Sequence, residues 1–363
     1  MNLLILEGDG IGPEISAATV RVLTRADELF DLGLKFNSMP IGFAAMEIFK
    51  TTFPKETLEA AKAADGTVLG PVSHNDYPPA AQGGINPSGA LRIGLDLYAN
   101  IRPARTREGF KPPCGKPLDL VIVRENTEGF YSDRSMFLGP GEMMPTPDLA
   151  LSFRKITRLG STRIAEAGFA LARRDGRKKV TAVHKANVLR VSDGLFLECT
   201  RQVAAKYAAE HPDITYEEKI VDAMAALLVR DASQFDVIVT TNMFGDILSD
   251  QASELSGSLG LAASLNAGDR YGVAQAQHGS APDIAGKDLA NPSSLIGSAA
   301  MLLGWLGQKH GNDNYRKAAA AIEQALDAAI ASPAERTRDL GGTLGTKAFT
   351  DAVIARVGKS AAA

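Results

Sequence analysis

Short apolar runs rich in β-branched residues alternate with helical patterns along most of the chain. The runs that predict buried strands are 3–7, 66–72, 118–124, 179–184, 216–221 and 236–241. Helical spacing separates most of them, for example over 13–29, where a proline stands in the first turn. Strands and helices in this alternation predict an α/β fold with a largely parallel sheet.

Size and composition exclude several classes of protein. The chain has 363 residues, which favours two domains, with 45% hydrophobic and 22% charged residues, typical of a soluble globular protein. A net charge of -3 gives no basic field for nucleic acid, and no run is apolar enough to span a membrane. The start "MNLLILEGDG" predicts a strand and not a signal peptide. Cys114 and Cys199 are the only cysteines, which favours a reducing, cytoplasmic location over a disulfide or zinc framework.

Two segments allow more than one interpretation. Residues 131–153 are rich in Pro, Gly and Met and form either a linker or a projecting arm; the apolar Met and Phe side chains favour an arm used in subunit contact. Gly8, Gly10 and Gly12 resemble a dinucleotide fingerprint, but the third glycine comes one place early and a proline follows. We therefore predict a tight turn into a helix there, and not a Rossmann site.

Carboxylates follow two of the predicted strands. Asp246, Asp250 and Glu254 lie four residues apart, so a helix would place them in one row, where like charges repel. Asp222 follows the strand 216–221. Oxygen ligands without histidine or thiolate favour a hard cation, Mg²⁺ or Mn²⁺. The alternatives are that Asp222 caps a helix and that the acidic row is a solvated face.

Cationic side chains lie on a predicted helix (Arg92), in the segment that follows it (Arg102) and at predicted strand ends (Arg124 and Lys185). Arginine forks bind carboxylates in a bidentate manner, and three candidates are Arg92, Arg102 and Arg124. The alternative is local pairing, of Arg92 with Asp96 and of Arg124 with Glu125 or Glu128. The candidate proton-transfer groups are Lys185 and Tyr131.

The ordered motifs along the chain resemble those of one family. They are "GDGIGPEI", "LDLYANIRPA", "VRENTEGFY", "HKANVLRVSDGLF", "VDAMAALLVRDASQFDVIVTTNMFGDILSD", "GSLGLAASLN" and "HGSAPDIAGKDLANP". Nearly end to end, the chain is similar to the metal-dependent β-decarboxylating dehydrogenases, the isocitrate/3-isopropylmalate dehydrogenase family. The resemblance implies a two-domain α/β fold that is not Rossmann. Residues 1–98 and 253–363 would form the larger, cofactor-side domain, residues 99–252 the smaller one, and 131–153 an inter-subunit arm.

The resemblance also implies a role for each candidate. Arg92, Arg102 and Arg124 would clamp the carboxylates of a malate unit. Tyr131 would protonate the enol after CO₂ leaves, and Lys185 would assist removal of the hydroxyl proton. Asp222, Asp246 and Asp250 would hold the metal, while Glu254 would be a helix-face residue. In this family the lysine and the first aspartate reach in from the neighbouring subunit, which implies an obligate homodimer.

The resemblance also bears on which nicotinamide cofactor the chain uses. Asp283 and Ile284 stand where relatives that use NADP carry a lysine and a tyrosine, so NAD is expected. The other implied cofactor contacts are His278, Gly279, Asn291 and Asn187.

Specificity for the 3-substituent is carried in the family by the segment before Arg92. Where isopropylmalate enzymes have two adjacent leucines, this chain has Ser88 and Gly89. Where isocitrate enzymes have a serine and then an asparagine, this chain has the same two residue types in the opposite order, Asn86 and Ser88. An acidic substituent, as in isocitrate or homoisocitrate, is therefore expected. The alternatives are 3-isopropylmalate, tartrate or D-malate, and a regulatory subunit, which would lack catalytic groups that this chain retains.

Overall fold

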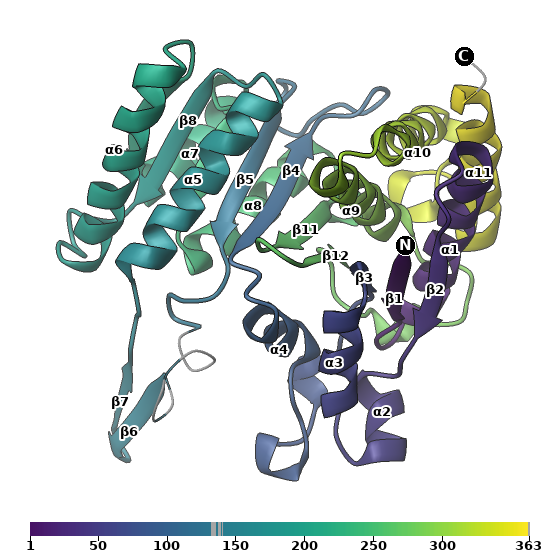
Figure 1. Cartoon of the computed structure of the whole chain (residues 1–363), viewed down its shortest axis with the longest axis horizontal. Coiled ribbons are helices and arrows are strands. Elements are labelled where there is room, and N and C mark those ends of the chain that lie inside the picture. The colour runs from purple at the N-terminus through teal and green to yellow at the C-terminus, as the bar shows by residue number, and fades with distance from the viewer. Residues whose placement is uncertain (132–135, 137–138, 140, 362–363) are drawn as a thin grey trace. The chain divides into compact units, whose positions relative to one another are not determined.

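The computed structural model describes residues 1–131, 136, 139 and 141–361 (Figure 1). The chain forms two compact units. The first comprises Met1–Leu95, Arg107–Phe110 and Ser258–Ala363, and the second comprises Asp96–Thr106 and Lys111–Gly257. Both chain ends thus belong to one unit and the middle of the chain to the other. No helix among the described residues has the length and hydropathy needed to cross a membrane.

The first unit is built on strands in the order β2-β1-β3-β12-β11. Their bounds are β1 Asn2–Leu6, β2 Lys35–Ser38, β3 Gly66–Leu69, β11 Ala263–Ala267 and β12 Gly272–Ala276. All neighbours run parallel except β11 and β12, which form an antiparallel pair. The sheet is therefore largely parallel, as the alternating pattern predicts.

The first unit also contains helices. They are α1 Gly12–Phe30, α2 Gly42–Phe49, α3 Lys55–Ala63, α4 Pro87–Gly94, α9 Ser293–His310, α10 Asp313–Ala331 and α11 Thr346–Ala361. The helix α9 lies against β11 and β12, and α1 packs against α10 and α11 (Figure 1). Most side chains of α9 are buried, among them Leu295, Leu302 and Leu303, because sheet and helix both cover it.

The glycine-rich loop after β1 is a tight turn into α1, which confirms the prediction. Gly8 and Gly10 have φ of 80° and 57°, a region that favours glycine. A Cβ on Gly10 would lie 2.0 Å from the carbonyl oxygen of Ser280. The backbone N–H of Ile11 donates to that same oxygen at 2.8 Å, so the turn is held against the segment that follows β12.

The second unit has strands in the order β4-β5-β10-β8-β9. Their bounds are β4 Ala99–Arg105, β5 Asp119–Glu125, β8 Lys179–His184, β9 Thr215–Ile220 and β10 Val237–Thr240. The sequence pattern missed β4, and the helical spacing seen over 89–98 extends too far, because α4 ends at Gly94. The charged residues and the proline within β4 hide its strand pattern, whereas β5, β8 and β10 are apolar runs that helices bury on both faces. The strand predicted over 216–221 is present as β9, but it lies at the edge and is only partly buried, so the prediction of a buried strand there is wrong.

Helices of the second unit cover both faces of these strands. They are α5 Arg158–Arg174, α6 Ser192–Glu210, α7 Val221–Asp231 and α8 Asn242–Ser256. Side chains alternate along β5: Val121 and Val123 enter the core with α5 and α6, while Leu120 and Ile122 enter the core with α7 and α8. A strand buried on both faces has a continuous apolar sequence, which is why "LDLVIVR" predicted it.

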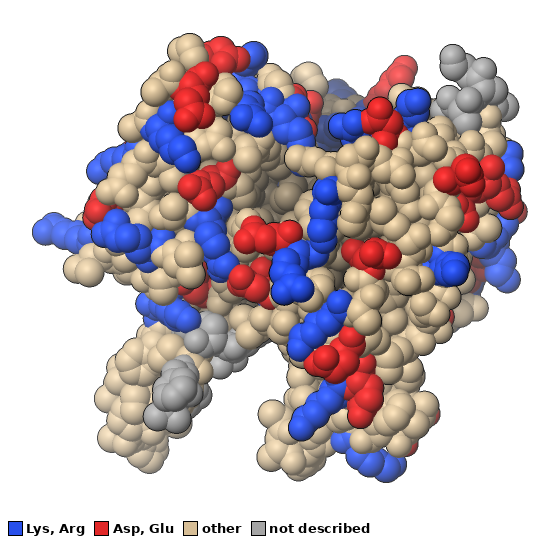
Figure 2. Space-filling view, viewed as in Figure 1, with Lys and Arg blue, Asp and Glu red and all other residues tan. Residues whose placement is uncertain are grey.

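The segment 131–153 contains an antiparallel hairpin. Its strands are β6 Glu142–Thr146 and β7 Leu149–Ser152, and it extends away from the α5–α6 layer of its unit (Figure 1). Five large apolar side chains are exposed on it: Met143, Met144, Leu149, Leu151 and Phe153. Figure 2 shows the hairpin as a surface with few charges. Residues 132–135, 137–138 and 140 of the predicted arm lie outside the described residues.

Candidate active site

The two central aspartates lie on one helix, as their spacing predicts. Asp246 and Asp250 are both on α8, and Glu254, one turn further, is exposed. The guanidinium of Arg102 lies 3.2 Å from the Asp246 carboxylate and 3.3 Å from that of Asp250. The repulsion within the acidic row is therefore offset by an arginine on strand β4.

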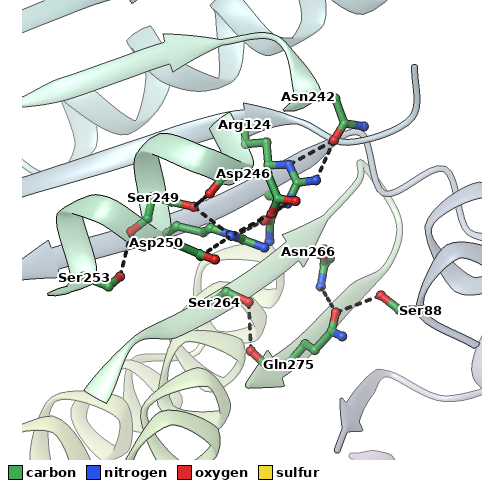
Figure 3. Close-up of polar contacts among 12 residues, drawn as sticks. Ser88, Arg124, Asn242, Asp246, Ser249, Asp250, Ser253, Ser264, Asn266 and Gln275 are labelled. Atoms are coloured by element: carbon green, nitrogen blue, oxygen red, sulfur yellow. Dashed lines mark hydrogen bonds and ion pairs between the residues drawn. The ribbon is translucent and has the colours of Figure 1, made fainter. Parts of the chain in front are cut away.

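Arg124, at the end of β5, is held by α8. Its side chain is 1% exposed, and its Nε and Nη2 donate to the amide oxygen of Asn242 at 3.0 and 2.6 Å (Figure 3). Its Nη1 donates to Asp246. The alternative of pairing with nearby glutamates is wrong, because Glu125 and Glu128 accept hydrogen bonds from Thr127 and Thr157.

Arg102 on β4 is the second buried guanidinium. Its Nε donates to Asn100, and its Nη1 donates to Ser249 Oγ at 2.7 Å. Burial and, next, the charge of neighbouring Arg124 lower the pKa of Arg102 to about 10, against the opposing effect of Asp246 and Asp250. Two buried cations held at fixed positions form a site suited to the carboxylates of an acidic ligand.

Tyr131 belongs to the same group. Its hydroxyl donates to Asp246 Oδ2 at 3.0 Å, and the guanidinium of Arg124 lies 5.6 Å from the centre of its ring. The second unit thus brings together five predicted site residues: Arg102, Arg124, Tyr131, Asp246 and Asp250. A phenol proton, two cations and two carboxylates in one cluster can bind an acid and exchange protons with it.

Lys185 and Asp222 form a separate pair. The Nζ of Lys185, just beyond β8, donates to Asp222 Oδ1, and this hydrogen bond lowers the pKa of Asp222. Asp222 lies inside the first turn of α7 after the cap residue Ile220, so the prediction that it caps the helix is wrong. Within the described residues no group of three or more His, Cys, Asp and Glu side chains could hold a metal ion. One copy of the described chain therefore does not assemble Asp222, Asp246 and Asp250 into one site.

Residues of the predicted specificity segment form a polar cluster in the first unit. Asn86 caps α4, because its side-chain oxygen accepts from the N–H of Gly89 at 3.3 Å. Ser88 Oγ donates to Gln275 Oε1 at 3.1 Å, and Asn266 Nδ2 donates to the same oxygen at 3.2 Å (Figure 3). Since both donors occupy Oε1, the amide nitrogen of Gln275 is directed away from them. Arg92 lies in the last turn of the same helix.

The partner that local spacing suggested for Arg92 is engaged elsewhere. Asp96 pairs with Arg163 at 2.6 Å. That alternative for Arg92 is therefore wrong, as it was for Arg124.

The predicted cofactor residues include an imidazole without a full set of partners. His278 Nδ1 lies 2.9 Å from the carbonyl oxygen of Gly279, while its buried Nε2 has no hydrogen-bond partner in the described structure. Burial lowers the pKa of His278, which keeps the ring neutral. Asp283 lies exposed on the 3₁₀ turn Pro282–Ile284. A neutral ring nitrogen and an exposed carboxylate suit the adenosine end of a dinucleotide.

The other two predicted cofactor residues differ in their surroundings. Asn291 is buried and donates to Asp339 at 2.9 Å, and its oxygen accepts from the N–H of Ser293 at 3.0 Å. Asn187 is exposed and belongs to the second unit. Only the second of these side chains is therefore directed into solvent.

Sequence reasoning missed several residues that hold the site together. Asn242 fixes Arg124, and Ser249 fixes Arg102. A signal for Asn242 was present, since it is the first polar side chain of the helix after β10, where ligands bind in parallel sheets. Gln275 had no such signal, because its link to Ser88 joins positions far apart in the chain.

The second unit gathers two buried arginines, a phenol and two carboxylates in one cluster, a set suited to a small acidic ligand and a hard cation. The chain matches the family model described as isocitrate/isopropylmalate dehydrogenase over residues 2–353. It belongs to this family of decarboxylating hydroxy-acid dehydrogenases, which act on small hydroxy acids and use a nicotinamide dinucleotide and a divalent metal ion.

Relatives and solved structures agree over nearly the full length. The chain is 42% identical to an isocitrate/homoisocitrate dehydrogenase of Thermus thermophilus, over 97% of each chain. It is 39% identical to a 3-isopropylmalate dehydrogenase of Sulfurisphaera tokodaii, over 98% of this chain and 99% of the other. The crystal structure of isocitrate dehydrogenase from Methylococcus capsulatus is similar with a TM-score of 0.84 and 39% identity, over 98% of this chain and 99% of the other.

Proposed function

We propose that this protein catalyses the NAD-dependent oxidative decarboxylation of a 3-substituted (R)-malate, with isocitrate or homoisocitrate as substrate. The polar cluster at the start of α4 carries the choice of substrate. Asn86, Ser88 and the Gln275 amide offer hydrogen-bonding groups where an apolar substituent would need a hydrophobic wall. The alternative substrate is 3-isopropylmalate, which the name of one relative at 39% identity favours.

The arginines bind and orient the substrate. Arg102 and Arg124 are buried and their guanidinium groups are held by Ser249 and Asn242, so they offer charge without having to be ordered on binding. Arg92, on α4, is the third carboxylate ligand. Such fixed cations bind a malate unit in one orientation.

Two proton-transfer steps involve residues of the chain. Lys185 assists removal of the proton of the substrate hydroxyl as the hydroxyl is oxidised. The Tyr131 hydroxyl, which donates to Asp246 at 3.0 Å, then supplies a proton to the enol carbon left after loss of CO₂. His278 and Asp283 would hold the adenosine end of NAD, which would supply the hydride acceptor for this oxidation.

Carboxylates of the site would hold the divalent ion. Asp246 and Asp250, four residues apart on α8, have side chains 35% and 50% exposed, so both reach solvent and suit Mg²⁺ or Mn²⁺. Asp222 completes the set. When bound, the ion acts as a Lewis acid on the oxidised carbon's oxygen.

A homodimer with shared sites accounts for the separation of the ligand groups. Asp222 is 68% exposed on its side chain and pairs with Lys185 outside the Asp246 cluster, so a second copy of the chain would supply both residues. The exposed apolar hairpin offers a surface for that contact, as do Val188 and Val191, which are 66% and 88% exposed. A dimer therefore accounts both for the separation of Asp222 from the Asp246 cluster and for the exposed apolar side chains.

The nucleotide preference rests on Asp283. Its exposed carboxylate can accept hydrogen bonds from ribose hydroxyls and repels a 2′-phosphate, which favours NAD over NADP. Cys114 and Cys199 form no disulfide with each other, which is in keeping with the reducing cytoplasm that we propose as the location.

The decisive experiment measures NADH formation with Mn²⁺ or Mg²⁺ on five acids: isocitrate, homoisocitrate, 3-isopropylmalate, D-malate and tartrate. An EDTA control tests the metal, and light scattering tests the dimer. Preference for a tricarboxylate supports the polar pocket. Preference for isopropylmalate would refute the pocket argument and leave the catalytic roles intact, and metal-independent turnover would refute the role of the aspartates.

A further inference from the structure

A fully buried carboxylate holds the backbone next to the catalytic lysine. Asp193, in the first turn of α6, is 0% exposed. Its Oδ2 accepts from the backbone N–H of Lys185 at 2.5 Å, and its Oδ1 pairs with Arg154. None of the steps proposed above uses Asp193 or Arg154, yet they form the most deeply buried ion pair described in this unit.

Arg154 connects this carboxylate with several other segments. Its side chain is 7% exposed, and it donates to Ser192 Oγ at 3.1 Å and to Thr241 Oγ1 at 2.9 Å. The guanidinium lies over the rings of Phe130 and Phe244, at 5.9 and 5.3 Å from their centres. One side chain thus contacts the residue before Tyr131, the start of α6 and the start of the helix that carries Asp246.

The same arginine stands at the base of the hairpin. It follows β7 by two residues, and its neighbour Lys155 exchanges backbone hydrogen bonds with Gly129 at 2.8 and 3.0 Å. The two legs of the hairpin are therefore joined at the point where Arg154 turns inward. A change in the hairpin base would reach Lys185 through only two side chains, Arg154 and Asp193.

Burial of such a pair is not explained by stability. Removing two charges from water costs about as much as their attraction returns, so buried ion pairs are poor stabilisers in general. The geometry instead specifies one arrangement, because both carboxylate oxygens of Asp193 are engaged and each engages a different segment. Lysine has a long flexible side chain, so the position of its backbone decides which groups its ammonium can reach.

We propose that Asp193 and Arg154 are positioning residues for Lys185: the pair fixes the lysine backbone relative to the hairpin base and to the Tyr131 loop. The inference rests on the proposed function, in which Lys185 assists removal of the hydroxyl proton. Neither residue touches the substrate, so the pair acts on the rate of the proton-transfer step and not on substrate binding.

The first test is Asp193→Asn, which keeps the size of the side chain and an acceptor for the Lys185 N–H but leaves Arg154 without its counter-charge. We expect kcat to fall by about 10- to 100-fold, the range for a misplaced catalytic group. KM should stay within about twofold, because the substrate-binding arginines are untouched.

The matched control is Asp236→Asn. Asp236 accepts from the backbone N–H groups of Lys178 and Lys179 at 2.5 and 3.3 Å and pairs with Arg177 at 3.0 Å. It has the same chemistry as Asp193 at the opposite end of β8, remote from Lys185. The control should retain wild-type kcat. Equal losses of kcat in both variants, or a rise of KM without loss of kcat in Asp193→Asn, would overturn the proposal.

Arg154→Met tests the same link from the other side if Asp193→Asn does not fold. It should lower kcat in the same way, and the double variant should be no slower than the slower single one, since both changes break one connection. Strictly additive losses would show two independent roles and would refute the coupling.

A measurement without substrate separates this proposal from the proposed function. Reductive methylation with mass spectrometry reports the reactivity of each lysine ammonium. In Asp193→Asn the reactivity of Lys185 should rise several-fold relative to Lys219, because Lys185 leaves Asp222; Asp236→Asn should show no such rise. Unchanged labelling of Lys185 would overturn the proposal even where the enzyme is active. A rise in labelling in a protein without turnover would leave the positioning intact and refute only the proposed reaction.

Discussion

Replacing either helix aspartate by asparagine should abolish metal-dependent activity, but only one of the two changes should destabilise the fold. Asp246 interacts with Arg124, with Arg102 at 3.2 Å and with the Tyr131 hydroxyl at 3.0 Å. Asp250 lies 3.3 Å from Arg102, at the outer side of the cluster. The variants Asp246→Asn and Asp250→Asn therefore remove the same charge from two different environments.

The magnitudes follow from burial. Removing one partner of a fully buried ion pair costs about 3–5 kcal/mol. The Asp246 side chain is 35% exposed, so water screens part of this, and we expect a loss of about 2 kcal/mol in the free energy of unfolding. The Asp250 side chain is 50% exposed, and its loss should cost about 0.5 kcal/mol.

The assay is urea unfolding of wild type and both variants, followed by circular dichroism in EDTA so that no metal binding contributes. Midpoints are compared between proteins of identical architecture, because a chain of two units need not unfold in one step. Manganese-dependent NADH formation is measured in parallel. Equal destabilisation by the two variants would refute the role of Asp246 as counter-ion to the arginines. Full Mn²⁺-dependent activity of either variant would sink its assignment as a metal ligand.

Three further changes have sharp outcomes. Asp283→Lys should shift use from NAD towards NADP, because a lysine attracts the 2′-phosphate that the aspartate repels. An unchanged ratio of kcat/KM for the two nucleotides would argue against the contact. Burial raises the pKa of Glu128 above its usual 4.5, so its contribution to stability is fully present below pH 4.5 and lost as the pH rises through the raised value. Glu128→Gln should remove that part of the pH dependence, and urea midpoints between about pH 4 and pH 8 that still follow the wild type would contradict it. Gly10→Ala should cost more than about 2 kcal/mol, since its Cβ would lie 2.0 Å from the Ser280 oxygen at φ 57°. Gly33→Ala, at φ 65° with nothing within 4 Å, is the matched control and should cost about 1 kcal/mol in a thermal unfolding comparison.

The strands buried on both faces were predictable, whereas β4 was not. Runs such as 118–124 are continuous and apolar because helices cover each face of the strand, and residues buried on both faces are apolar. The strand Ala99–Arg105 carries Arg102 and Pro103, and its identity comes from antiparallel pairing with β5. A charged side chain and a proline inside a strand thus weaken the pattern by which that strand is recognised.

The sequence by itself determined the acidic row, the glycine turn and the set of residues that follow the strands. Each of these depends on spacing within a few residues: a helix repeats every 3.6 residues, and a strand ends where its apolar run ends. Asp246 and Asp250 were therefore predictable as neighbours on one helix, and the structure confirms it.

Tertiary structure alone decided which groups meet. Arg124 is bound by Asn242, Lys185 pairs with Asp222, and Arg154 reaches Asp193, contacts that join residues 118, 37 and 39 positions apart. The local partners considered for Arg124, which were Glu125 and Glu128, are closer in the chain, and that alternative was wrong. The physical reason is that strand order brings distant segments together, and burial then requires each buried charge to be paired there, irrespective of its neighbours along the chain.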